Sequence, residues 1–358
     1  MNIYNHETRP YEGIVLERFR HLPMGGKMGD LPPHLQHESF IRTGIKKTGG
    51  PNMRLYRLEM DVPSLTVTAY IFNKFVHPTE DRYITPREAA TLQDFPIDWV
   101  FKGTKGQVQK QIGNAVPVLL SRAIAQSVAH FLARQKHRHP MVIASYFTGA
   151  GGLDLGFEMV KTDDISFETK FSTDIASWCE ATIQANRPGW NFLREDIRLL
   201  EPSTVCSQLP DGVDLIIGGP PCQPFSVAGK QKGTADPLGQ LYADFIRHVD
   251  HLQPKVVVME NVYGLAQVKS ANMIELIYAS YRAIGYEVKH QELLAADYGT
   301  PQKRRRLIFV AAKDISAYRF PVPTHTAQPN LLGLPLHNGA GHSLTGLPPA
   351  IETKRQNR

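Results

Sequence analysis

The chain has 358 residues, of which 42% are hydrophobic, and a formal net charge of +6. This length allows two or three domains around ordinary globular cores. No apolar run reaches membrane-spanning length and the N-terminal residues form no apolar signal segment, so we expect a soluble, cytoplasmic protein with no membrane partner. The three cysteines, Cys179, Cys206 and Cys222, are too few for a disulfide framework. The 14 histidines show no ligand spacing with them, and we predict no metal site.

The positive charge is concentrated in the N-terminal part of the chain. Residues 1–140 contain 19 Lys and Arg against 12 Asp and Glu, a net charge of +7, whereas the remaining residues contain 21 against 22, a net charge of −1. A localised basic surface suits a polyanion such as nucleic acid. A solvated basic face without a partner would give the same count.

The first 140 residues predict a loop-rich module followed by helices. Residues 1–80 are rich in Pro, Gly, Lys and Arg, with one helix expected at 11–19 and strands within 55–71. Such modules often carry recognition residues, although packing alone would also explain this one. Thr85, Pro86 and Glu88 match a capping box, which predicts a short helix that Pro96 stops. Residues 111–117 predict a polar turn before a longer helix, and 135–140 a basic linker.

From residue 141 onward, strand and helix patterns alternate, which is typical of a parallel α/β sheet. Strands are expected at 142–147, 167–173, near 192, and at 213–217, 255–259, 286–293 and 307–311. Helices are expected near 153 and at 177–186, 241–252 and 274–284. In such sheets, ligands bind outside the carboxyl ends of the strands.

Two of these strand ends suggest a nucleoside ligand. A glycine-rich turn at 148–152 follows the first strand, and Asp174 and Asp196 end the next two. The glycine spacing departs from the dinucleotide pattern G-x-G-x-x-G, so a nucleoside cofactor without a pyrophosphate fits better. Asp174 would hold ribose hydroxyls and Asp196 an adenine amino group. Each aspartate taken alone could equally cap a helix.

The fourth strand leads into Gly218-Gly219-Pro220-Pro221-Cys222-Gln223-Pro224-Phe225-Ser226. A cysteine held on a stiff Pro/Gly turn at a strand end predicts a nucleophilic thiol, whereas most isolated cysteines are buried and inert. Glu260 ends the neighbouring strand and could donate a proton or a hydrogen bond. Period-2 alternation would place Arg304 and Arg306 on one side of the last strand, where they could hold an anion or a carbonyl oxygen.

Six spaced motifs make this sequence resemble the DNA (cytosine-5)-methyltransferases. They are the cysteine loop GGPPCQPFS, the ENV at Glu260, QKRRR from Gln302, the turn FTGAGG, RYITPREAATLQDFP and QIGNAVP. The resemblance covers nearly all of residues 1–313. The order is unusual, because the last two motifs precede the glycine turn here. The chain therefore resembles a circularly permuted family member, which requires termini that lie close together.

The resemblance implies a Rossmann-like methyltransferase sheet with helices on both faces and a small loop-rich DNA-recognition domain. Residues 1–80, completed by the tail at 320–358, would form the recognition domain. Residues 81–134 would carry the two displaced motifs and pack on the catalytic domain, 135–140 would be a linker, and 141–319 would form the catalytic core.

The resemblance also implies S-adenosylmethionine as cofactor and double-stranded DNA as substrate. Cys222 would attack C6 of a flipped-out cytosine, Glu260 would contact its N3 and amino group, and Arg306, supported by Arg304, would hold the O2 side. The implied cofactor contacts are Phe147, Thr148, Gly149, Gly151, Gly152, Asp174, Ile175, Asp196, Ile197, Pro221, Leu241, Asn114, Ala115 and Val116. The implied DNA contacts are Gln223, Ser226, Lys46, Lys47, Arg54 and Arg57.

The sequence departs from the family pattern at several positions. Leu238 and Ser145 stand where Arg and Asp are common, Val118 replaces a second Pro, and Asp174 replaces a more usual Glu. None of these touches the predicted chemical core.

A monomeric modification enzyme is the leading hypothesis, with a cognate restriction endonuclease as a functional rather than physical partner. The alternatives are a tRNA cytosine methyltransferase, against which Ser226 argues, a non-catalytic DNA-binding homologue, and a nicotinamide oxidoreductase. The recognition sequence does not follow from the residues.

Overall fold

The computed structural model describes residues 3–43, 55–69, 74–133, 139–162, 164–221, 237–266 and 271–353. The chain divides into two compact units. Unit 1 comprises Met1–Asn114, Gly299–Arg304 and Thr324–Arg358, and unit 2 comprises Ala115–Tyr298 and Arg305–Pro323. Residues 81–114, which we expected beside the catalytic core, therefore belong to the unit that contains the N-terminal module and the C-terminal tail.

Unit 2 is built on a seven-stranded sheet with the order β10-β12-β9-β8-β5-β6-β7. The strands are β5 (Met141–Tyr146), β6 (Phe167–Thr173), β7 (Asn191–Leu193), β8 (Leu215–Gly218), β9 (Val256–Val262), β10 (Glu287–Leu294) and β12 (Arg305–Ala312). Only β12 runs against its neighbours, pairing antiparallel with both β9 and β10. The α/β fold and all seven predicted strands are confirmed, with ends shifted by at most three residues.

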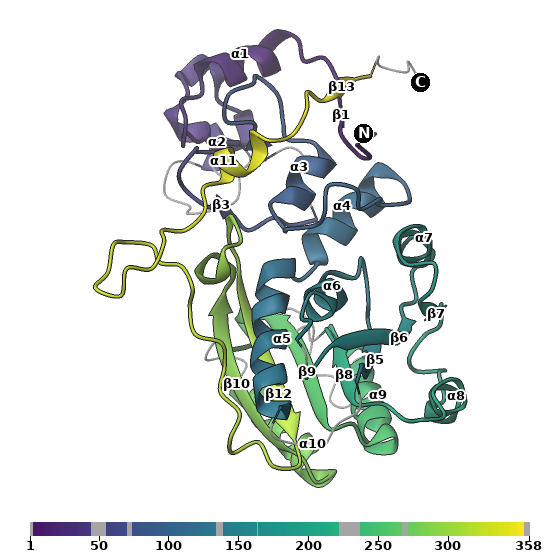
Figure 1. The fold of residues 1–358 in the computed structure, drawn as a ribbon. Coiled ribbons are helices and arrows are strands. Elements are labelled where there is room, and N and C mark those ends of the chain that lie inside the picture. Colours follow the sequence, from purple (N-terminus) through teal and green to yellow (C-terminus); the bar gives the residue numbers. More distant parts are fainter. Residues whose placement is uncertain are drawn as a thin grey trace. The chain divides into compact units, whose positions relative to one another are not determined.

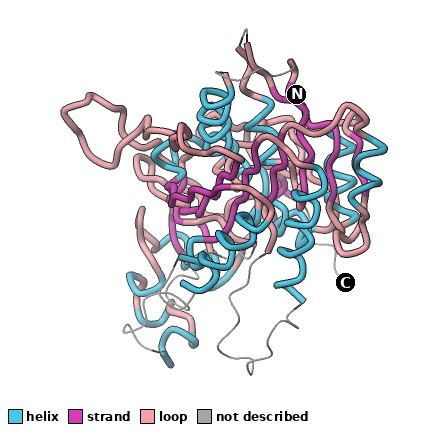
Figure 2. The backbone as a smooth tube through the Cα atoms, turned by 90° about the horizontal axis from the view of Figure 1, so that it is seen from below, coloured by secondary structure: helices cyan, strands magenta, loops and turns pink. Residues whose placement is uncertain are grey.

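Helices cover both faces of this sheet (Figures 1 and 2). They are α5 (Val118–Leu132), α6 (Gly152–Glu158), α7 (Ser177–Asn186), α8 (Pro202–Gln208), α9 (Pro237–Leu252) and α10 (Ala271–Ala283), with 3-10 turns at Tyr263–Ala266 and Ala295–Tyr298. Alternate side chains of β9 enter opposite cores: Val256 and Val258 face α5 and α6, whereas Val257 and Met259 face α9 and α10. A strand buried on both faces explains the continuous apolar runs of the sequence.

α5 and α6 pack so closely that one position between them excludes any side chain. A Cβ atom added at Gly156 would lie 2.3 Å from the Cβ of Ser121 and 2.5 Å from the backbone nitrogen of Arg122. We expect Gly156→Ala to lower the free energy of unfolding by about 3 kcal/mol, because neither neighbour can move without separating the helices. Urea unfolding measures this change. Gly189→Ala, with no atom within 4 Å of the added Cβ, is the control, and equal losses in both variants would contradict the prediction.

Unit 1 consists of short elements around its own apolar core. The helices are α1 (Gly13–His21), α2 (Glu38–Thr43), α3 (Pro86–Thr91), α4 (Lys105–Asn114) and α11 (Ala340–Leu344), with 3-10 turns at Met28–Asp30 and Pro33–Leu35. Three pairs of two-residue parallel strands join distant segments: β2 (Tyr56–Arg57) with β4 (Phe75–Val76), β3 (Ser64–Leu65) with β11 (Gln302–Lys303), and β1 (Glu7–Thr8) with β13 (Ile351–Glu352). Phe19, Leu31 and Val76 are among the residues of its core.

The pairing of β1 with β13 places the first and last described segments side by side. The backbone nitrogen of Ile351 donates to the carbonyl oxygen of His6 at 2.9 Å, and that of Thr353 donates to Thr8 at 2.9 Å. The tail is fixed again at α11, where the Gly341 nitrogen donates to the Glu59 carbonyl oxygen at 2.9 Å. Paired segments this near the two ends of the described chain meet the geometric condition for a circular permutation.

The predicted capping box is present, whereas the predicted polar turn is shorter than expected and comprises residues 115–117. The hydroxyl of Thr85 accepts a hydrogen bond from the Glu88 nitrogen at 3.2 Å, and the Glu88 carboxylate accepts one from the Thr85 nitrogen at 2.7 Å. Residues 111–114, expected in a turn, instead form the last turn of α4. Gly113 in this helix must be glycine, because a Cβ atom there would lie 2.2 Å from the backbone nitrogen of Ala69.

One helical stretch among the described residues, Lys105–Leu132, is long and apolar enough to cross a membrane, with a mean hydropathy of 1.3. It comprises α4 and α5, and 61% of the apolar window is buried inside the protein. A buried core helix gives the same signal, so this is weak support for a membrane span.

Candidate active site

A pocket of about 160 Å³ lies in unit 2 at the carboxyl ends of the parallel strands. Its walls come from the ends of β5 and β6, the segment after β7, the loop after β8 and the first turns of α9. The lining residues are Tyr146, Phe147, Thr173, Asp174, Ile175, Glu195, Asp196, Ile197, Arg198, Pro221 and Leu241. Seven of them are predicted cofactor contacts: Phe147, Asp174, Ile175, Asp196, Ile197, Pro221 and Leu241. The pocket thus contains Asp174 and Asp196, the two strand-end residues on which the prediction of a nucleoside ligand rests.

The glycine-rich turn and Asp174 are joined by hydrogen bonds. The Asp174 carboxylate accepts one from the backbone nitrogen of Gly149 and one from that of Ala176, both at 3.0 Å. The turn needs left-handed backbone, with φ of 57° at Gly149 and 80° at Gly151. Glycine takes this conformation without a steric penalty. The carboxylate therefore holds the turn in place, and its oxygens act as hydrogen-bond acceptors at the wall of the pocket.

Asp196 begins a tight turn and is paired with an arginine. Its backbone oxygen accepts from the nitrogens of Leu199 and Leu200, at 2.8 and 3.0 Å. Its carboxylate contacts the guanidinium of Arg198, and that hydrogen-bonded pairing lowers the pKa of Asp196. The carboxylate is thus an acceptor at neutral pH. Arg198 is largely exposed, so an amino group in the pocket can compete with it.

Glu260 and Arg306 form an ion pair within unit 2. In the antiparallel ladder of β9 and β12, Glu260 lies opposite Ile308, so Arg306 is its diagonal neighbour on the same face. The Nε atom of Arg306 lies 2.5 Å from Oε1 of Glu260, and both side chains are 12% exposed. The Nε–H bond has no well-aligned acceptor among the described residues, so the contact is an ion pair rather than a hydrogen bond.

The loop that leads to Cys222 is built against this pair. A Cβ at Gly219 would lie 3.0 Å from Oε2 of Glu260, and one at Gly218 would lie 2.7 Å from the backbone oxygen of Tyr146. Asn261 donates from Nδ2 to the carbonyl oxygen of Pro220 at 3.1 Å. The two glycines therefore allow the loop to approach Glu260 and the backbone of Tyr146, and the Asn261 side chain holds the start of the loop by its hydrogen bond to Pro220. The sequence reasoning gave Asn261 no role, although it stands in the ENV motif.

The predicted site residues Cys222, Gln223 and Ser226 lie outside the described residues. The loop is described up to Pro221, which lines the pocket. Thr148 and Gly152 lie in the glycine turn and are buried, and Ala115 and Val116 are buried in unit 2 before α5. Asn114 is the last residue of α4 and of the first segment of unit 1.

Arg304 does not share a strand face with Arg306. It lies before β12, in unit 1, and is fully buried. Its Nη1 donates to the carbonyl oxygen of Val67 at 2.8 Å and its Nη2 to that of Gly113 at 2.9 Å. The expectation that period-2 alternation pairs the two arginines is wrong, because the strand begins one residue later. Arg304 holds together three segments of unit 1.

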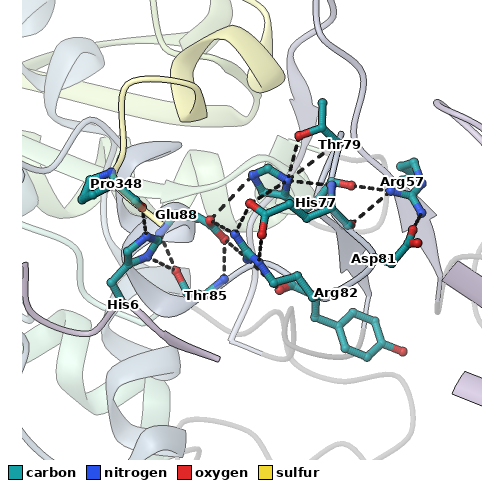
Figure 3. A network of polar contacts seen from close by, with 11 residues as sticks. His6, Arg57, His77, Thr79, Asp81, Arg82, Thr85, Glu88 and Pro348 are labelled. Atoms are coloured by element: carbon teal, nitrogen blue, oxygen red, sulfur yellow. Dashed lines mark hydrogen bonds and ion pairs between the residues drawn. The ribbon is translucent and has the colours of Figure 1, made fainter. Parts of the chain in front are cut away.

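Arg57 is also buried rather than presented to DNA (Figure 3). Its guanidinium donates to the carbonyl oxygens of Phe19, Leu22, His77 and Glu80 and to the Asp81 carboxylate, at distances of 2.5 to 3.1 Å. With its donors used inside unit 1, the side chain has a structural role, which contradicts the expected DNA contact. The other predicted basic contacts, Lys46, Lys47 and Arg54, lie outside the described residues.

A second buried carboxyl group lies beside the glycine turn. Asp154 in α6 is fully buried, and burial raises its pKa to about 7, with hydrogen bonding by Ser145 and Thr169 offsetting part of the shift. The hydroxyl of Thr148 donates to Ser145 Oγ at 3.1 Å, which links the turn to this group. An aspartate at position 145, common in the family, would place two carboxyl groups together here. Serine avoids that repulsion.

Asp154 should make stability fall as the pH rises. The unfolded chain releases this proton near pH 3.8 and the folded chain near 7, so the free energy of unfolding decreases across that window and levels off above it. The whole decrease is about 4 kcal/mol at most. We expect Asp154→Asn to flatten this pH dependence in urea unfolding from pH 4 to 8. The exposed Asp164→Asn is the control, and an unchanged slope in Asp154→Asn would contradict the assignment.

Among the described residues, no group of three or more His, Cys, Asp and Glu side chains is placed to hold a metal ion. The fold and the pocket define an α/β protein with a strand-end site of the kind that holds nucleoside cofactors. A family model for C-5 cytosine-specific DNA methylase matches residues 32–130 and 141–337, and the chain belongs to this family.

Relatives of this chain are Type II methyltransferases. It is 39% identical over 183 residues to M1.HphI of Haemophilus parahaemolyticus, covering 50% of this chain and 48% of that protein. It is 34% identical over 227 residues to M.AquIA of Picosynechococcus sp., covering 58% and 89%. It is 35% identical over 185 residues to M.NgoPII of Neisseria gonorrhoeae, covering 52% of each. The chain spans about half the length of the first and third of these relatives.

Proposed function

We propose that this protein transfers a methyl group from S-adenosylmethionine to C5 of a cytosine in double-stranded DNA, through a covalent adduct with Cys222. The observation that carries the proposal is the ion pair of Glu260 and Arg306 against Gly219, three residues before Cys222. The same loop lines the strand-end pocket at Pro221. A base-binding pair, a nucleophile and a cofactor pocket are thereby connected by one short loop.

The residues of the pocket fit S-adenosylmethionine. Asp174, held by two backbone N–H groups, is a fixed acceptor for ribose hydroxyls, and Asp196 is an acceptor for an adenine amino group. Ile197 and Leu241 supply apolar walls for the base. When bound, the cofactor supplies an electrophilic methyl group on its sulfonium sulfur. The proposed turn and flanking contacts are Phe147, Thr148, Gly149, Gly151, Gly152, Ile175, Pro221, Ala115 and Val116.

The proposed chemistry assigns one task to each residue around the base. The Cys222 thiolate forms a bond to C6, and the electron pair of the C5–C6 double bond moves to the C5 side of the ring. Glu260 holds N3 and the exocyclic amino group and favours protonation there, while Arg306 stabilises charge at O2. C5 takes the methyl group as its bond to the sulfonium sulfur breaks, which would leave S-adenosylhomocysteine, and a base then removes the C5 proton. The electrons re-form the double bond and expel the Cys222 thiolate.

The target cytosine must leave the base stack of the duplex, because C6 of a stacked cytosine is inaccessible. Basic residues of the N-terminal part would hold the DNA phosphates, with Lys46, Lys47 and Arg54 as proposed contacts and Gln223 and Ser226 near the flipped base. We further propose that the protein acts as a monomer in the cytoplasm of a prokaryotic cell, as the modification partner of a restriction endonuclease.

Methyl transfer from labelled S-adenosylmethionine to duplex DNA and to tRNA, measured side by side, tests the proposal. We expect incorporation into duplex DNA, alkali-stable and recovered as 5-methylcytosine. Incorporation into tRNA alone would replace the proposed substrate, and absence of any transfer or adduct would favour a non-catalytic DNA-binding role. Sequencing of the methylated DNA then gives the recognition site.

A further inference from the structure

A fully buried histidine in α9 joins Tyr146, which lines the pocket, to the turn that begins at Asp196. The ring of His248 lies between the side chain of Tyr146, at the end of β5, and the backbone of Leu200. Its Nδ1 is 2.9 Å from the Tyr146 hydroxyl oxygen, and its Nε2 is 3.0 Å from the Leu200 carbonyl oxygen. A carbonyl oxygen only accepts, so Nε2 carries the proton and Nδ1 accepts from the hydroxyl of Tyr146.

The direction of both hydrogen bonds is fixed at neutral pH. Burial, with the nearby Arg247 charge, lowers the pKa of His248 to about 4, although its bond to Leu200 opposes the shift. Burial also raises the pKa of the Tyr146 hydroxyl. The imidazole is therefore neutral and the hydroxyl protonated throughout the physiological range.

The Leu200 end of this link continues to Asp196. The Leu200 nitrogen donates to the Asp196 carbonyl oxygen at 3.0 Å, which closes the turn formed by residues 196–200. α9 holds the same turn a second time, because Nη2 of Arg247 donates to the carbonyl oxygens of Ile197 and Leu200 at 3.1 and 3.0 Å. The position of Asp196 is thus set by side chains of α9 that lie behind the pocket.

The placement of a histidine here is not explained by packing. Leu241, Phe245 and His248 follow the helical spacing of the face that α9 turns to the sheet, where an apolar side chain would fill the core. A buried imidazole is tolerated only when both nitrogens are bonded. No step of the proposed chemistry uses His248, so its two hydrogen bonds act through the groups that they join.

We propose that His248 is a positioning residue for the cofactor: by tying Tyr146 to Leu200, it sets the distance between the β5 wall and the Asp196 wall of the pocket. His248 therefore increases the affinity for the nucleoside part of S-adenosylmethionine and affects neither the affinity for DNA nor the rate of the chemical step. This inference rests on the proposed function, and it adds a residue that touches neither ligand.

The test compares His248→Leu, which loses both hydrogen bonds, Tyr146→Phe, which loses one, and His251→Leu, an exposed control on the same helix. Calorimetry with S-adenosylmethionine should show affinity falling roughly tenfold in His248→Leu, the change expected for one net buried hydrogen bond, and about threefold in Tyr146→Phe. Duplex DNA affinity and the single-turnover rate at saturating S-adenosylmethionine should stay within about twofold of wild type for His248→Leu. His248→Gln, which can still donate to Leu200, should recover part of the affinity.

Unchanged S-adenosylmethionine affinity in folded His248→Leu would overturn the inference and leave the proposed function intact. A parallel loss of DNA affinity or of the saturated rate would also overturn it, because that marks a general structural role. If His248→Leu does not fold, unchanged affinity in Tyr146→Phe decides against the inference. A wild-type protein that fails to bind S-adenosylmethionine would overturn the cofactor assignment and the inference together.

Discussion

Cys222→Ser is expected to abolish methyl transfer while leaving duplex DNA binding within about twofold of wild type. A serine hydroxyl at neutral pH is almost fully protonated and is a far weaker nucleophile than a thiolate. Without addition to C6, C5 has no electron density to accept the methyl group. We expect the single-turnover rate to fall by at least about 10³-fold, the scale on which the loss of a nucleophile acts. Labelled methyl transfer to duplex DNA measures this rate.

A covalent trap distinguishes the loss of the nucleophile in Cys222→Ser from a loss of the folded state. Duplex DNA with 5-fluorocytosine at the target cannot lose its C5 substituent, so the adduct should accumulate with wild type and survive denaturing electrophoresis. Cys206→Ser is the matched control, because Cys206 is an exposed free thiol in α8. An adduct that persists in Cys222→Ser, or one that disappears in Cys206→Ser, would refute the assignment.

The sheet and the strand ends of the pocket were predictable because they depend on local pattern. β8 and the first four residues of β9 are continuous apolar runs, β5 is largely apolar, and the polar residues at or shortly after the strand ends lie at the same edge of the sheet. This placed Asp174, Asp196 and Glu260 without knowledge of any contact. Glu260 and Arg306 are diagonal neighbours because β9 and β12 pair in the sheet.

The failed predictions concern residues whose roles depend on distant segments. Arg304 and Arg57 resemble exposed basic residues in the sequence, yet both donate to backbone carbonyl oxygens far away in the chain. The GNAVP motif contains turn residues, yet Gly113 lies in a helix, where it must be glycine because residues 68–69 pass too close for a side chain. Tyr146 and His248 are 102 residues apart, and no sequence pattern signals their bond. Alternation and propensity carry no information about such contacts.

Glu260→Gln is expected to reduce the single-turnover methyl-transfer rate by about 10²–10³-fold, with little change in DNA affinity. Glutamine keeps the size and one acceptor oxygen, but it lacks the negative charge that would stabilise a proton on N3 and that pairs with Arg306. Glu292→Gln is the matched control, since Glu292 pairs with the exposed Arg305 on the adjacent strand. A rate within about threefold of wild type in Glu260→Gln would contradict a role at the base.

The ion pair also predicts that replacing its two partners is not additive. Both side chains are 12% exposed, so Arg306→Ala leaves a largely buried carboxylate without its counter-charge and should lower the free energy of unfolding by about 3 kcal/mol. Adding Glu260→Gln removes that charge and should restore much of the stability. The rate should not recover, because the double variant lacks both of the proposed contacts to the base. The double variant should therefore regain stability relative to Arg306→Ala without regaining the methyl-transfer rate. A double variant that regains both would show that the ion pair has only a structural role.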